Sequence, residues 1–252
     1  MLTNDSGICI RAVDYSETSQ VVTFFTKQSG LVTAIAKGAK RQKSPFGGPI
    51  EIFSCGNIVF SDSTREKLAT LVEFEPLAGV ANYPVLSADI YVLNCCLFAA
   101  ELVGSLVKDY DPHPGLFDRF LEFIKNASQN KTSEKQHRII LANLILFQLT
   151  LLKEIGLCPV FDYCVNCRNG FHSNWREAYF SNNAKGLICR DCQGPFPDKI
   201  RLTIETAECL SDIKFLLSAS QTTLKNIEDI LIRYISDVLG RPPRMARYVL
   251  SS

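Results

Sequence analysis

The chain has 252 residues, of which 46% are hydrophobic and 21% are charged. This ordinary globular composition excludes a disordered, collagen-like or coiled-coil chain, and the length allows one large domain or two to three small ones. Lys and Arg number 27 and Asp and Glu 26, a formal net charge of +1. Any contact with nucleic acid or a membrane must therefore come from local patches.

The cellular compartment is indicated by the N-terminus and the cysteines. No basic region followed by an apolar one opens the chain, so we expect no signal peptide. Two apolar stretches, Ile90–Val107 and Ile139–Leu152, are interrupted by polar residues or too short for a membrane span, and fit buried helices. Ten cysteines without a secretory signal indicate a reducing compartment, and we expect a cytoplasmic protein.

The first 80 residues are rich in β-branched and aromatic residues and predict strands. A short turn at residues 28–30 predicts a hairpin between the second and third strands. Five short strands suit a small closed barrel, because closure removes exposed edges, and we predict a five-stranded OB-fold. The predicted strands are Gly7–Asp14, Gln20–Thr26, Leu31–Lys37, Ile50–Phe60 and Lys67–Glu75.

The last of these strands alternates in character, which predicts a half-buried antiparallel strand. One face carries Leu68, Thr70, Val72 and Phe74, and the other carries Lys67, Glu73 and Glu75.

Helical periodicity dominates the remainder of the chain. The predicted helices are Leu86–Val107, Leu116–Ala127, Glu134–Ile155, Thr203–Leu217 and Thr223–Leu239. Gly240 and the following prolines end the last one. The predicted fold class is thus a multidomain α+β protein, with an OB barrel over residues 1–80 and a mainly α-helical domain over residues 81–252. A cysteine-rich insertion at about residues 158–199 interrupts that helical domain.

The most specific motif lies in this insertion. Cys164-x2-Cys167 and Cys189-x2-Cys192 are two paired thiols with 21 residues between them. Structural Zn²⁺ takes four ligands in a tetrahedron, and each Cys-x-x-Cys turn presents two sulfurs to one ion. We therefore predict one structural zinc per chain, held by these four cysteines in a ribbon or knuckle whose connecting segment forms a small hairpin.

Other interpretations of the cysteines remain open. The four could form disulfides, stay as free thiols or hold an iron–sulfur cluster. We expect Cys158 to be packed and not to be a ligand, and His172 to be a ligand only if one cysteine is absent. The other five read as small core residues: Cys9, Cys55, Cys95, Cys96 and Cys209.

A dense basic patch follows the third predicted strand. Four positive residues fall within seven positions with no acid among them: Lys37, Lys40, Arg41 and Lys43. On an OB-fold, strands two and three and the neighbouring loops form a groove for single-stranded nucleic acid. We predict phosphate contacts here, with Arg11 and Arg65 as weaker additions; the alternative is a solvated loop. Some nearby aromatics could stack bases, although most would fill the core: Tyr15, Phe24, Phe25, Phe46 and Phe53.

A second basic patch comprises Arg241, Arg244 and Arg247. Here a polar tail, or packing of the arginines against helix C-termini, is favoured over contact with nucleic acid.

Sequence motifs of catalysis are missing: there is no phosphate-binding glycine loop, no dinucleotide fingerprint and no nucleophile elbow. The three histidines lie in different segments, and no carboxylates have metal-binding spacing. We therefore expect a protein that is not an enzyme.

The order of these parts resembles bacterial DNA repair and recombination mediator proteins of the RecO family. The stretches that carry the resemblance are Lys37–Ser44, Gly156–Cys167, Gly186–Cys192 and Ile232–Arg247. The resemblance covers essentially the whole chain, and it is the order and spacing of the stretches that are specific.

The resemblance implies an N-terminal OB domain, a helical C-terminal domain and zinc on the four cysteines, with no enzymatic activity. It implies binding to single- and double-stranded DNA and annealing of strands coated by single-stranded-DNA-binding protein. The implied direct partners are RecR and the acidic tail of the single-stranded-DNA-binding protein, and RecA and RecF are implied as indirect partners. The implied process is RecF-pathway repair at the nucleoid. The barrel's charge is balanced, with 8 basic and 8 acidic residues in residues 1–80, which is a departure from a strongly basic DNA-binding barrel.

Two alternatives stay open. One is an OB-fold and zinc-ribbon module that binds RNA or protein and has no role in recombination. The other is a metal-dependent enzyme with His172 as a ligand and an open coordination position.

Overall fold

The computed structural model describes residues 2–61, 68–77, 83–128 and 133–250. The chain divides into two compact units, Met1–Thr132 and Ser133–Ser252. Among the described residues, no helix has the length and apolarity that crossing a bilayer requires.

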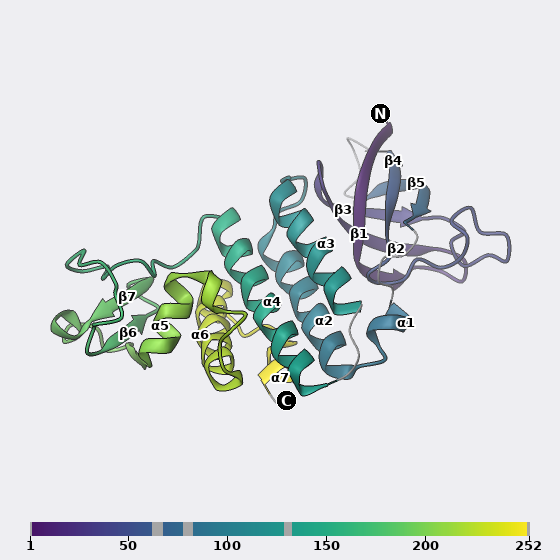
Figure 1. Cartoon of the computed structure of the whole chain (residues 1–252). Coiled ribbons are helices and arrows are strands. Elements are labelled where there is room, and N and C mark those ends of the chain that lie inside the picture. Colours follow the sequence, from purple (N-terminus) through teal and green to yellow (C-terminus); the bar gives the residue numbers. More distant parts are fainter. Residues whose placement is uncertain (1, 62–67, 78–82, 129–132, 251–252) are drawn as a thin grey trace. The chain divides into compact units, whose positions relative to one another are not determined.

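The first unit is built on a closed barrel with the strand order β1-β2-β3-β5-β4, drawn in purple and blue in Figure 1. The predicted five-stranded barrel is confirmed, and the order fits the OB-fold. All neighbouring strands are antiparallel except β3 and β5, which pair in parallel. The strands are β1 (Leu2–Asp14), β2 (Gln20–Thr26), β3 (Gly30–Ala36), β4 (Cys55–Ser61) and β5 (Ala69–Pro76).

Two details of the barrel differ from the sequence expectations. The predicted strand from Ile50 starts only at Cys55, because the preceding residues form a turn in which Phe53 adopts a φ of 68°. In β5, Ala69 and Leu71 are buried while Val72 is 40% exposed, so the predicted face that carries Thr70 and Val72 is the wrong one there. A register shift opposite Val59 and Phe60 then makes a bulge, which interrupts the period of two and lets Phe74 pack against the core three positions after Leu71.

Three helices complete the first unit: α1 (Tyr83–Leu86), α2 (Ile90–Leu106) and α3 (Pro114–Ser128). The helix predicted from Leu86 begins only at Ile90, because Asp89 caps its N-terminus by accepting hydrogen bonds from the backbone N–H groups of Tyr91 and Val92, and the short α1 precedes it.

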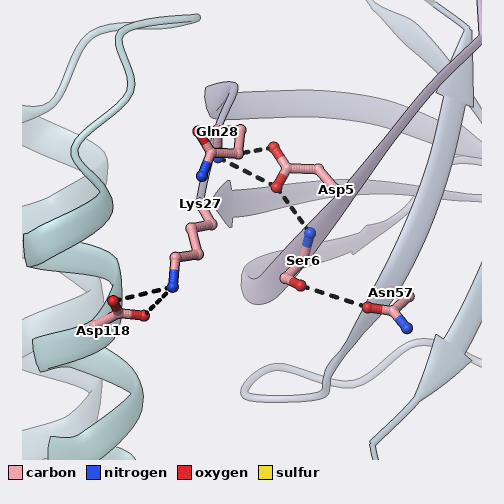
Figure 2. Close-up of polar contacts among 6 residues, drawn as sticks. All are labelled: Asp5, Ser6, Lys27, Gln28, Asn57 and Asp118. Carbon is pink, nitrogen blue, oxygen red and sulfur yellow. Dashed lines mark hydrogen bonds and ion pairs between the residues drawn. The ribbon is translucent and has the colours of Figure 1, made fainter.

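Helix α3 covers one end of the barrel's outer surface. The Phe25 ring on β2 is fully buried and lies 5.9 Å from the ring of Phe117 and 6.3 Å from that of Phe120. Beside it, Lys27 Nζ contacts both carboxylate oxygens of Asp118, at 2.8 and 3.0 Å (Figure 2). The helix is thus attached to the barrel by apolar packing and a bidentate ion pair.

The turn between β2 and β3 is held by a buried carboxylate. Asp5 on β1 accepts hydrogen bonds from the Gln28 backbone N–H, at 3.1 and 2.9 Å, and from the Ser6 N–H at 2.8 Å (Figure 2). At the start of β3, Gly30 has a φ of 68°, and a Cβ there would lie 2.4 Å from the backbone nitrogen of Asp111. The segment between α2 and α3 therefore packs directly against a bare backbone.

The second unit combines helices with a small sheet of order β7-β6-β8. The predicted hairpin is present as β6 and β7, whereas β8 and α7 are not among the predicted elements. The predicted helix Thr203–Leu217 ends early, because Asp212 is extended and caps a separate 3-10 turn. The elements are α4 (Glu134–Glu154), β6 (Ala178–Ser181), β7 (Gly186–Cys189), β8 (Ile200–Leu202), α5 (Ile204–Ser211), α6 (Gln221–Leu239) and α7 (Ala246–Leu250).

The boundary between the compact units falls between Thr132 and Ser133. Helices α2 and α3 belong to the first unit because α2 contacts β1 and α3 contacts β2. The domain boundary at residue 80, which rests on the change of sequence period, stays a prediction.

Gly30→Ala is expected to destabilise the first unit by about 1–3 kcal/mol more than Gly47→Ala does. Both glycines have left-handed backbones, with φ of 68° and 75°, so both variants carry the same steric cost of about 1–2 kcal/mol. A Cβ at Gly47 meets nothing within 4 Å, whereas one at Gly30 meets the Asp111 backbone. Urea unfolding followed by circular dichroism measures the difference, and equal losses would contradict the packing argument.

Candidate nucleic-acid interface and metal centre

The basic patch lies on the long connection from β3 to β4, which is anchored at its far end in the barrel core. Phe46 and Ile50 are both buried there. The Gln20 side chain pairs with the Ile50 backbone, accepting from its N–H at 2.9 Å and donating to its carbonyl at 3.4 Å. The connection is therefore a fixed part of the barrel.

The basic loop, defined here as residues 37–43, is also tied to the turn between β1 and β2. The Lys40 N–H donates to the Thr18 carbonyl at 3.1 Å, and the Gly38 N–H donates to Ser19 Oγ at 3.3 Å. Ala39 is fully buried between these contacts. The loop backbone is held, while three of its four charged side chains are exposed: Lys37, Arg41 and Lys43.

The fourth, Lys40, is half-buried and forms an ion pair with Asp14 on β1, with Nζ 2.5 Å from Oδ2. The Asp14 side chain is 64% exposed, so the pair lies in high dielectric and contributes about 0–1 kcal/mol. A phosphate can compete for Lys40 at small cost. Residues 18–50 contain five basic residues and no acidic one, so the surroundings favour an anion.

The aromatic residues near the loop divide sharply by burial. Tyr15, in the turn between β1 and β2, is 65% exposed. The four phenylalanines are buried and not available to a base: Phe24, Phe25, Phe46 and Phe53. Tyr15 is therefore the member of this set that is available to stack on a base.

The outer surface of the barrel continues from the loop across three strands. Arg11 on β1 is exposed and lies opposite Thr23 on β2, which lies opposite Thr33 on β3. The two threonine hydroxyls are 3.1 Å apart. We call these three residues the polar row: Arg11, Thr23 and Thr33. On β2 the polar row lies next to Phe25, the residue that α3 covers. Arg65 lies outside the described residues.

The second candidate site is in the other unit. The sulfurs of Cys164, Cys167, Cys189 and Cys192 all lie within 4.8 Å of one another. A tetrahedron with metal–sulfur bonds of about 2.3 Å places its sulfurs about 3.8 Å apart. The sulfurs of Cys167 and Cys189, which belong to different pairs, are 3.8 Å apart. The sequence-predicted ligands are thus brought together in a group that could hold a metal ion.

The first cysteine pair sits in a tight turn. The Arg168 N–H donates to the Cys164 carbonyl at 2.8 Å, and Arg168 has a φ of 65°. The Val165 N–H donates to the Leu187 carbonyl at 2.9 Å, which docks the turn on β7. Gly186 permits this approach, because a Cβ there would lie 2.5 Å from a Val165 methyl group.

The second pair follows directly from β7, with Cys189 at its end and Cys192 closing a 3-10 turn. Both pairs therefore depend on the same strand. Cys158 is exposed and lies outside the group, so the expectation that it is packed is wrong. The five cysteines predicted as core residues are all buried: Cys9, Cys55, Cys95, Cys96 and Cys209.

The surroundings of the Cys164 thiol favour its charged form. Burial raises the pKa of the Cys164 thiol, but hydrogen bonds from the backbones of Cys167, Cys189 and Asn166 outweigh it and bring the pKa to about 7. Burial raises the pKa of Cys189 to about 12, so that thiol ionises only beside a positive charge. A coordinated metal ion supplies that charge and deprotonates its thiol ligands.

Comparison with known families finds a match to each of two parts of the chain. Residues 1–80 match the family described as Recombination protein O N terminal, and residues 87–247 match the one described as Recombination protein O C terminal. The chain belongs to the recombination protein O family. This membership supports a role in DNA repair and recombination.

Similar proteins are found across distant bacteria under the name DNA repair protein RecO. One from Anaeromyxobacter sp. (strain K) is 30% identical over 206 residues, covering 81% of this chain and 76% of its own. One from Rhodopirellula baltica is 28% identical over 222 residues, covering 88% and 77%. One from Bacillus velezensis is 27% identical over 259 aligned positions, covering 99% and 94%.

Replacing one clustered cysteine, Cys164→Ser, is expected to abolish metal binding and unfold the knuckle while leaving the barrel folded, since a structural metal contributes folding free energy. Trp175, the single tryptophan, donates its ring N–H to the Gly170 carbonyl close to the first pair, so its fluorescence reports locally. We expect a red-shifted Trp175 emission and loss of the metal in elemental analysis.

The matched control is Cys158→Ser, which removes an exposed thiol outside the group. It should retain both the metal and the emission of the unmodified protein. Equal metal content in the Cys164→Ser variant would exclude Cys164 as a ligand.

Proposed function

We propose that this protein is a DNA-binding recombination mediator that anneals complementary single strands through the barrel's basic surface. The observation that carries the proposal is the fixed basic loop beside the exposed Tyr15 ring and the polar row. Such a surface neutralises phosphates and offers a stacking face without reading base edges. Annealing needs this combination, since the protein must act on any sequence.

The wider role follows from family membership and is part of the same proposal. With RecR, the protein would help RecA load onto DNA coated by single-stranded-DNA-binding protein, in the RecF pathway and in the bacterial cytoplasm. It would bind single- and double-stranded DNA and the acidic tail of the coating protein. It would not be an enzyme.

We assign Zn²⁺ to the four cysteines, because tetrahedral thiolate coordination suits this ion and leaves no position for a reacting water. Cys164, Cys167, Cys189 and Cys192 would hold it. The zinc would then support the knuckle and do no chemistry, which argues against the alternative of a metal-dependent enzyme with His172 as ligand.

An apolar groove of about 570 Å³ lies in the second unit beside the end of α4, lined by Leu149, Leu210 and Ile213 among others. Its charged lining is Lys153 against Glu154 and Asp162. This balance does not favour an acidic peptide.

The test of the proposed function is annealing of two complementary oligonucleotides that carry the cognate single-stranded-DNA-binding protein. We expect the unmodified protein to accelerate annealing and the variant with Lys40, Arg41 and Lys43 all changed to Gln to lose the acceleration. The salt dependence of single-strand binding should flatten by about 0.7 per lost phosphate contact, about 2 in all.

The matched control changes Lys135, Arg176 and Lys185 to Gln, which removes the same charge. All three are exposed and belong to the second unit, and none forms an ion pair within the described part of the chain. Equal loss in this control would assign the effect to net charge. No acceleration by the unmodified protein would favour the alternative, an OB-fold and zinc-ribbon module that binds RNA or protein.

Tyr15→Ala is expected to weaken binding to single-stranded DNA by about 1–3 kcal/mol, while Tyr15→Phe keeps the ring and binds normally. Leu2→Ala is the control, because Leu2 is 61% exposed at the start of β1, whereas Tyr15 follows the end of that strand. Fluorescence anisotropy with a labelled oligonucleotide measures all three. Normal binding by Tyr15→Ala would place the bases elsewhere.

A further inference from the structure

The C-terminal segment after α6 forms a fixed basic surface. Gly240 ends α6 in a left-handed conformation with a φ of 68°. The segment then packs by Pro243, Ala246 and Val249, which are all buried. We define the C-terminal ridge by four exposed residues of this segment: Arg241, Arg244, Arg247 and Tyr248.

The ridge is ordered by spacing and by local bonds. The buried residues and the arginines both recur every third position, and all three arginines are exposed. Two hydrogen bonds hold the backbone turns, from the Ala246 N–H to the Pro243 carbonyl at 3.3 Å and from the Tyr248 N–H to the Met245 carbonyl at 3.0 Å.

The charge of this segment is entirely positive. Residues 238–252 contain three arginines and no acidic residue. The Arg247 guanidinium lies 4.6 Å from the centre of the Tyr248 ring and donates to its hydroxyl at 2.7 Å. Tyr248 is still 41% exposed. A guanidinium and a ring presented together form a surface for phosphate and for a base.

We propose that the C-terminal ridge is a second contact for the nucleic-acid backbone, on the unit that does not carry the basic loop. The inference rests on the proposed function and extends it. Annealing brings two polyanionic strands together, and a protein with two separate basic surfaces can neutralise both. Arginine suits this task because its planar fork matches phosphate oxygens.

Nucleic acid is favoured over an acidic protein segment by the aromatic ring. A chain of carboxylates has no group that stacks on Tyr248, whereas every base has a π face. An acidic protein partner is therefore the competing outcome of the test.

The test measures the salt dependence of binding to a thymidine homopolymer with Arg241, Arg244 and Arg247 all changed to Gln. Three lost contacts on a single strand lower the slope of log affinity against log salt concentration by about 2. Between 50 and 200 mM salt, the factor by which affinity falls should therefore be about 20 times smaller for the variant than for the unmodified protein. Annealing should slow by a similar factor. Arg→Lys at the same three positions keeps the charge and should keep the slope.

The comparison variants separate the possible failures. An unchanged slope in the ridge variant, or an equal change in the Lys135, Arg176 and Lys185 control, overturns the inference. If the basic-loop variant alone loses slope, the proposed function stands without the ridge; if neither does, both fail. An unchanged slope with lost binding to polyglutamate identifies an acidic protein partner. If the triple variant fails to fold, Arg241→Gln alone, outside both helices, should lower the slope by about 0.7.

Discussion

Closure of the barrel between β3 and β5 is the constraint on which the candidate DNA surface depends. The two strands pair in parallel through Ala34 with Ala69 and Ile35 with Thr70. Parallel neighbours cannot be joined by a tight turn, and here β4 comes between them in sequence. The chain must therefore leave β3 and cross to β4 through residues 37–54. This crossing carries the basic loop, and the buried Phe46 and Ile50 hold it against the barrel.

In the cysteine knuckle, too, one strand determines where the functional residues lie. One strand, β7, receives the first cysteine pair through a backbone hydrogen bond and delivers the second pair from its own end. Gly186 at its start is required because the first turn approaches so closely. A strand of four residues therefore sets the relative positions of four cysteines, which explains how a small sheet can assemble a group that could hold a metal ion.

The parts of the fold that were predictable are those that a local pattern determines. Cysteine spacing predicted the four-cysteine cluster, and strand and helix periods predicted the barrel and four of the five helices well. The errors arise where a local feature interrupts the period: the bulge in β5, and Asp212, which ends α5. Tertiary burial was not predictable either. Glu228 on α6 is fully buried against Gln148, and burial raises its pKa to about 8, although the sequence presents it as an ordinary polar position.

The balanced charge of the barrel is compatible with binding DNA because screening makes electrostatics local. At physiological salt the Debye length is about 8 Å, so exposed acidic groups farther away hardly weaken the attraction at the basic loop. Residues 18–50, without a single acidic residue, matter more than the total for residues 1–80. In the proposed role, a few phosphate contacts on each of two surfaces would also keep each strand weakly held and exchangeable. A protein that anneals strands would have to release the duplex it makes, and a uniformly basic barrel would retain it.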